Sequence, residues 1–134
     1  MFRFFLGVSM LLFLYSCSDS GTNSNNVDAT YTEISTQIFD VSCSCHLSAT
    51  GSGGQYVVLA SDQAYLNLVS QPSSQNSTFL RVNPGNPTDS YLYMKIIGDE
   101  RISGQRMPRN GPPYLTDEQI ESIRKWIADG AQNN

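Results

Sequence analysis

The sequence is poor in charge, and what charge it has is mostly acidic. Charged residues make up 15% of the 134 residues, and 12 acids against 8 bases give a formal net charge of −4. Nucleic-acid-binding proteins need clustered Lys and Arg to track the phosphate backbone, so we expect no nucleic-acid partner. With one histidine and no second cysteine pair elsewhere, the chain also lacks the usual zinc sites built from four Cys and His ligands.

The common signatures of an enzyme are absent as well. The single histidine stands directly beside a cysteine, so no separate nucleophile and base form a pair. No glycine-rich phosphate loop and no internal repeat is present. We therefore expect no catalytic residues and no enzymatic activity.

The N-terminal apolar run is too short to cross a membrane, which takes about 20 residues. Residues 1–16 carry one base, Arg3, followed by an almost unbroken apolar stretch and a small residue, Ser16. This pattern is typical of a secretory signal peptide. The segment Leu14-Tyr15-Ser16-Cys17 resembles the lipobox of bacterial lipoproteins, although Tyr15 departs from the small residue usual at its place.

The lipobox resemblance implies that Cys17 is lipidated and becomes the mature N-terminus. Residues 17–30 are almost free of apolar side chains and are expected to form a flexible tether. The chain would then be anchored by lipid in a bacterial cell envelope, facing the periplasm or the exterior. The folded domain is predicted to span residues 31–134.

Four short helices are predicted in this domain, joined by long loops rich in Gly and Pro, which gives an all-α fold. The first runs from Thr32 to about Val41, and the second opens with Ser61 as its N-cap. The third covers residues 90–97 and ends at Gly98, although the composition of its interior would equally suit a strand. The fourth begins with a capping box formed by Thr116 and Gln119 and ends at Gly130, which suits the left-handed C-terminal position. Apolar residues make up only 40% of the chain, so a group other than side chains is expected to fill part of the interior.

The most informative segment is Ser42-Cys43-Ser44-Cys45-His46. A Cys-His dipeptide with a second cysteine just upstream, in an exported protein, is typical of covalent attachment of c-type haem. The thiols add to the vinyl groups, and the adjacent histidine faces the iron from the proximal side. A methionine thioether on the other side gives a six-coordinate iron suited to electron transfer.

Two methionines are candidates for this second axial position. Met94 lies inside an apolar helical segment, where methionine usually fills the core. Met107 lies in a loop before Pro108, and proline favours extended geometry in the residue that precedes it. Met107 is therefore the predicted distal ligand.

Taken in order, these landmarks resemble the single-haem cytochrome c domains of bacterial exported proteins. The resemblance extends over residues 34–131 and includes Arg106-Met107-Pro108, Gly111-Pro112-Pro113 and Trp126-Ile127. It implies a cytochrome c-like fold, one covalent haem c held by Cys43, Cys45, His46 and Met107, and axial metal ligation by His46 and Met107. The implied function is electron carriage between redox partner proteins. Four arginines are candidates to bind the haem propionates: Arg81, Arg101, Arg106 and Arg109.

The cysteine spacing departs from the family pattern, which has at least two residues between the cysteines. Only Ser44 separates Cys43 from Cys45, and the usual first-cysteine position is occupied by Ser42. Three outcomes stay open: both cysteines bind haem, Cys45 alone binds it, or no haem is attached. The last outcome corresponds to a haemless lipoprotein module with a binding or structural role, and a copper site built from Cys43, Cys45, His46 and Met107 is a weaker alternative.

Overall fold

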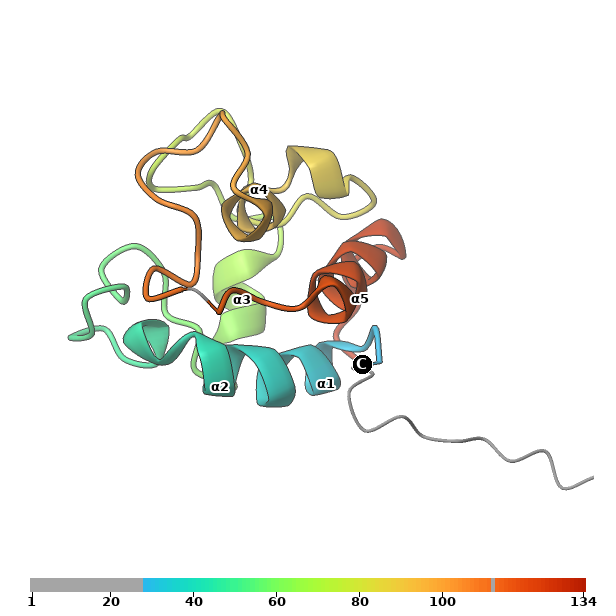
Figure 1. Cartoon of the computed structure of the whole chain (residues 1–134). Helices are drawn as coiled ribbons and strands as arrows, with labels where there is room; N and C mark the ends of the chain where they lie inside the picture. The colour runs from blue at the N-terminus through green and yellow to red at the C-terminus, as the bar shows by residue number, and fades with distance from the viewer. Residues whose placement is uncertain (1–27, 112) are drawn as a thin grey trace, which may run out of the picture.

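The computed structural model of the chain describes residues 28–111 and 113–134, and Figure 1 shows their arrangement. Within these ranges the fold is all-α, as predicted: the backbone forms helices and isolated bridges but no strand. The predicted signal peptide, Cys17 and residues 17–27 of the predicted tether lie outside the described residues. In the part that is described, no helix combines the length and the apolar character needed to cross a bilayer.

The first helical segment is continuous but changes its geometry along its length. It consists of α1 (Tyr31–Ile34), the π-helical η1 (Ser35–Phe39) and α2 (Asp40–Ser42). Thr30 caps its start by accepting a hydrogen bond from Glu33 N–H at 3.3 Å. Ile34, Ile38 and Phe39 are fully buried on one face, as the predicted apolar periodicity requires.

The second helix is shorter than predicted. We expected it to begin at Ser61, but α3 (Ala64–Leu68) begins at Ala64, and its N-cap, Gln63, makes no side-chain capping bond. Val69 then leaves the helix in extended geometry and forms a bridge with Val82. Because of this bridge, the loop between Val69 and Val82 folds back and Val82 lies beside the end of α3.

The third and fourth helices agree with their predicted starts and ends. Helix α4 (Tyr91–Ile97) ends at Gly98, which has the left-handed φ of 77° that favours glycine at this place. Helix α5 (Asp117–Ala128) begins with the predicted capping box, in which Thr116 and Gln119 bond each other's backbone N–H groups. Gly130 follows α5 with φ 99°.

The first and last helices pack together and close the core at one end (Figure 1). The rings of Tyr31 and Trp126 lie 5.9 Å apart, and those of Tyr31 and Tyr65 lie 5.2 Å apart, edge to face. The Tyr65 hydroxyl donates to the carbonyl oxygen of Ala131 at 3.0 Å. These three aromatic side chains connect α1, near the start of the domain, and α5, near its end, with α3.

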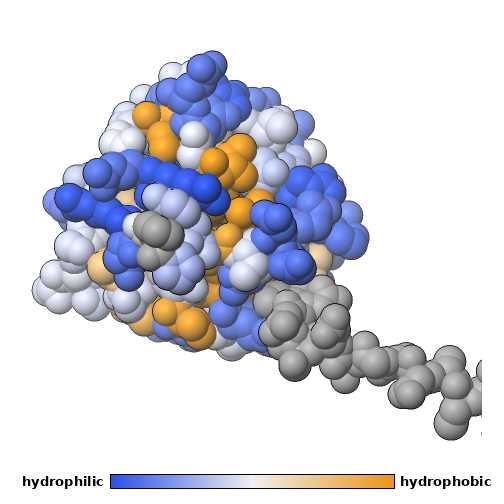
Figure 2. Space-filling view, in the orientation of Figure 1, coloured by the Kyte–Doolittle hydropathy of each residue, from blue (hydrophilic) through white to orange (hydrophobic). Residues whose placement is uncertain are grey.

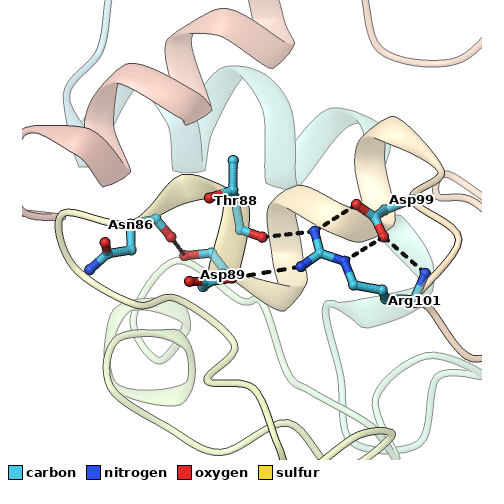
Figure 3. A network of polar contacts seen from close by, with 6 residues as sticks. Asn86, Thr88, Asp89, Asp99 and Arg101 are labelled. Atoms are coloured by element: carbon cyan, nitrogen blue, oxygen red, sulfur yellow. Dashed lines mark hydrogen bonds and ion pairs between the residues drawn. The ribbon is translucent and has the colours of Figure 1, made fainter.

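A polar network holds the loop after α4 against η3 (Pro87–Asp89), as Figure 3 shows. The Arg101 guanidinium bonds both carboxylate oxygens of Asp99, at 2.8 and 2.7 Å, and donates to the carbonyl oxygen of Thr88 at 3.0 Å. It also lies 3.6 Å from Asp89 and 5.6 Å from the centre of the Phe79 ring. The contacts of Arg101 therefore hold its guanidinium group within this network.

Candidate functional site

A cavity of about 440 Å³ lies between α4 and the turn that follows α2. Its walls are residues 42–46, parts of the loops 52–59 and 73–75, one face of α4, and residues 107–110 with Leu115. On the face drawn in Figure 2, apolar residues are visible between hydrophilic ones. The volume lies within the range of pockets that hold small molecules and cofactors.

All four residues predicted to hold a cofactor line this one cavity. They are Cys43, Cys45, His46 and Met107. The fold thus brings two segments that are distant in sequence to one cavity, the first from the turn after α2 and the second from the loop before α5. No group of three or more His, Cys, Asp or Glu side chains able to hold a metal ion occurs among the described residues.

The backbone around His46 selects the tautomer of its neutral ring. Nδ1 lies 3.0 Å from the carbonyl oxygen of Val57, and a carbonyl oxygen only accepts hydrogen bonds. Nδ1 therefore carries the proton, and Nε2 of the neutral ring keeps its lone pair. A histidine held in this way is ready to bind a metal through Nε2.

The glycine-rich loop is required because it packs directly on the Cys-His turn. An ideal Cβ at Gly53 would lie 2.5 Å from Nε2 of His46 and 2.6 Å from each of the two ring carbons next to it. These near-equal distances place Gly53 over the face of the ring. The Gly53 N–H also donates to the carbonyl oxygen of Cys45 at 3.0 Å, so the loop fixes both residues of the dipeptide.

Met107 is positioned by the backbone of α4. Its N–H donates to the carbonyl oxygen of Lys95 at 2.9 Å. In the turn that follows, the Gly111 N–H donates to the carbonyl oxygen of Pro108 at 3.1 Å. The Met107–Pro108 peptide bond is cis. Met94, the competing candidate, is fully buried in the core and lies outside the cavity wall.

The two cysteines are free thiols in different surroundings. Cys43 is half-buried and packs against the hydrophobic core, whereas Cys45 is exposed. Burial, followed by the nearby Cys45 and Asp40, raises the pKa of the Cys43 thiol to about 12. Cys43 is therefore protonated across the physiological pH range.

Two of the four candidate arginines line the cavity, and a lysine joins them. Arg81 is anchored by hydrogen bonds to the carbonyl oxygens of Asn67 at 2.8 Å and Tyr56 at 2.9 Å. Arg109 also lines the cavity, and its side chain is exposed. Lys95 is 7% exposed, and its Nζ donates to the carbonyl oxygen of Ser103 at 2.9 Å. Burial lowers the pKa of both Arg81 and Lys95.

The other two arginines do not line the cavity. Arg101 is held by Asp99 and Asp89 as described above. Arg106 donates from Nε to the carbonyl oxygen of Ile96 at 2.7 Å and lies 4.3 Å from the centre of the Tyr114 ring. The sequence could not show which arginines line the cavity, because Arg81 and Arg106 are held by backbone carbonyl oxygens 10 to 25 residues away in the chain.

Sequence reasoning also missed three residues of the site: Gly53, Val57 and Lys95. A signal for Lys95 was present, since it is the single charge inside the apolar run of residues 91–97. The roles of Gly53 and Val57 follow from tertiary contacts alone. Comparisons of the chain with protein-family models, curated proteins and solved structures found no match.

Proposed function

We propose that this chain is an exported electron carrier with one covalently attached haem c and axial ligands from His46 and Met107. The observation that carries the proposal is that both ligands and both thiols line one cavity. In a protein of this kind the polypeptide supplies the ligands, the burial and the orientation, while the haem supplies the electron chemistry when bound.

The donor set fits a haem iron. Neutral imidazole and methionine thioether are the axial pair of c-type cytochromes, and this pair raises the reduction potential. The Val57 carbonyl holds the proton on Nδ1 and leaves Nε2 of His46 available. Gly53 supports the proximal side because its missing Cβ leaves room for the imidazole ring.

The charge of the cavity wall fits a ligand that carries carboxylates. Arg81, Lys95 and Arg109 line the cavity, and no Asp or Glu is among the described residues that do so. This is unusual for a chain with a net charge of −4. Haem propionates would place two carboxylates among these cations, which compensates for the burial of Lys95.

The arrangement of the helices is also what a cytochrome c-like domain requires. Helix α5 packs against α1, and the cavity lies between the turn after α2 and the loop before α5. In the proposed carrier, electron transfer occurs through the edge of the haem, with no substrate bound. The redox partners are other proteins, and the lipid on Cys17 holds the domain near them at the membrane.

The proposal is tested by producing the full chain in a bacterial host with a working haem-attachment pathway. We expect a red protein whose intact mass includes one haem and whose absorption spectrum shows a six-coordinate, low-spin iron. His46→Ala and Met107→Ala should each abolish the six-coordinate spectrum. Met94→Leu is the matched control, because Met94 lies in the core and its replacement should leave the spectrum unchanged.

The cysteine spacing favours a second function, that of a haemless lipoprotein module that uses the same cavity for an apolar, anionic ligand. The two functions differ in the role of the axial residues. A haemless module predicts a colourless protein in the host described above, with little spectral change in His46→Ala and Met107→Ala. A colourless wild-type protein without added haem mass would refute the electron-carrier proposal.

A further inference from the structure

The two thiols of the site do not lie on one face of the turn that carries them. The turn η2 (Ser44–His46) is a 3₁₀-helix, and it is closed by a hydrogen bond from His46 N–H to the carbonyl oxygen of Cys43 at 2.8 Å. In such a turn residues three apart are aligned, whereas residues two apart point in different directions. Counted at this spacing, Cys43 (φ −115°, ψ 31°), which precedes the helical residues, pairs with His46, and Ser42 at the end of α2 pairs with Cys45.

This alignment matters because a porphyrin is flat and its vinyl groups lie on its edge. The histidine approaches the iron from above the plane, so a side chain aligned with His46 is directed at the face of the ring. Cys43 is in this position, and it also packs against the hydrophobic core. Cys45 is exposed and free of such packing, and it lines the same cavity.

We infer that the haem is attached by a single thioether from Cys45 and that Cys43 stays a free thiol. This inference rests on the proposed function and specifies its attachment site. The Cys45 sulfur adds to one carbon of a vinyl group, and the thiol proton goes to the other carbon. One S–C bond forms, the vinyl double bond becomes single, nothing leaves, and no oxidant or reductant is consumed.

Ser42 provides a direct way to restore the second thioether. It is half-buried, lines the cavity and lies three residues before Cys45. A cysteine at this position would share a face with Cys45. The double variant Ser42→Cys/Cys43→Ser therefore has the geometry for attachment to both vinyl groups.

The test compares four full-length proteins from the host with the haem-attachment pathway: wild type, Cys43→Ser, Cys45→Ser and Ser42→Cys/Cys43→Ser. Each protein is denatured, treated with iodoacetamide and digested, and the peptides are analysed by mass spectrometry. Free thiols become alkylated, whereas thioether-linked cysteines carry haem. The pyridine haemochrome spectrum gives a second measurement, because its α band shifts with each vinyl group that is converted.

We expect haem on the Cys45 peptide of the wild type and alkylation of Cys43. Cys43→Ser should keep covalent haem, Cys45→Ser should lose it, and the double variant should shift the α band to the position of two thioethers. A wild-type thioether on Cys43, or loss of covalent haem in Cys43→Ser, would overturn the inference and leave the proposed function standing. Haem that acid and organic solvent extract from the wild type would overturn both the inference and the covalent attachment in the proposed function, and absence of haem from all four proteins would overturn both proposals entirely.

Discussion

Gly53 and His46 are in direct contact through bare backbone, since a Cβ on Gly53 would lie 2.5 Å from Nε2. The close approach supports the face of the imidazole and leaves no space for any other residue at position 53. His46 is the last residue of the short helix η2 and Gly53 lies in a loop, and the hydrogen bond from Gly53 N–H to the carbonyl oxygen of Cys45 holds the loop at the helix. The position of the proposed proximal ligand therefore depends on a glycine.

The first prediction is that Gly53→Ala displaces the His46 ring. The added methyl group must move either the imidazole or the loop, at a cost of about 1–3 kcal/mol in the free energy of unfolding. We expect loss of the six-coordinate spectrum together with lower stability in urea unfolding.

Gly85→Ala is the control for this prediction. A Cβ at Gly85 has open space around it, but the residue has a φ of 83° that is strained for alanine. This variant should lose about 1–2 kcal/mol of stability and keep the spectrum of the wild type. Equal spectral effects in the two variants would contradict the role that we assign to Gly53.

The second prediction separates two arginines of the cavity wall. Arg81→Gln removes hydrogen bonds to Asn67 and Tyr56, which join α3 to the glycine-rich loop, and should cost about 2 kcal/mol. Arg109 makes no hydrogen bond to the described residues, so Arg109→Gln should leave the free energy of unfolding of the haem-free chain unchanged. Urea unfolding of both variants without haem is the measurement, and a similar loss in both would refute the distinction.

The third prediction concerns the capping box of α5. Thr116→Ala removes the acceptor of the Gln119 N–H bond and should lower the free energy of unfolding by about 1 kcal/mol. Thr78→Ala is the matched control, because Thr78 is exposed in a loop and caps no helix. Thermal unfolding followed by circular dichroism compares the two variants, and equal losses would show that the cap has no special role.

The sequence predicts the features that depend on interactions between residues close together in the chain. Helix α5 was predicted with its caps because its signals lie within a few residues of each end. The predicted start of α3 was wrong because Ser61 has good capping chemistry, but residues 61–63 form a turn in which the N–H groups of Gln63 and Ala64 both donate to the carbonyl oxygen of Ala60.

In the candidate site, too, local motifs predicted some residues, whereas the roles of others depend on tertiary contacts. His46 and Met107 were predicted from local motifs, and the structure brings both to one cavity. The contact with Gly53, the hydrogen bond to Val57 and the burial of Lys95 result from folding of segments that are apart in the chain. No local pattern contains that information.

The fourth prediction is a dependence of stability on acid pH through Asp99. Hydrogen bonds from the Arg101 side chain, and then from its backbone, lower the pKa of Asp99 from 3.8 to about 2. A carboxyl group with a lowered pKa stabilises the fold above its unfolded pKa, and this contribution is lost as the pH falls through its folded pKa. Wild type should therefore be more stable than Asp99→Asn at neutral pH, and the difference should disappear between pH 3.8 and about pH 2.

Unfolding in urea at several pH values measures this difference. The same pair of proteins in an Arg101→Ala background completes a double-mutant cycle and should show a smaller dependence on pH. A difference between wild type and Asp99→Asn that is constant with pH would show that the contact with Arg101 does not control the ionisation of Asp99.

The last prediction concerns Lys95, whose ammonium group is buried in the cavity wall and bonded to the carbonyl oxygen of Ser103. Lys95→Met keeps a similar volume and removes the buried charge, and water can replace the ammonium at exposed Ser103. Because burial lowers the pKa of Lys95, the charged form destabilises the fold at neutral pH. We therefore expect the haem-free variant to be more stable than the haem-free wild type.

This gain should depend on pH and on haem. The penalty in the wild type is relieved as the pH rises towards 10.5, the ordinary pKa of lysine, so the gain should shrink over that range. With haem attached, its carboxylates would compensate the charge of the ammonium group, so the same substitution should give no gain or a loss. Urea unfolding of both proteins, with and without haem, measures these effects. A gain that is unchanged by haem would mean that the cations of the wall have no anionic partner in the cavity.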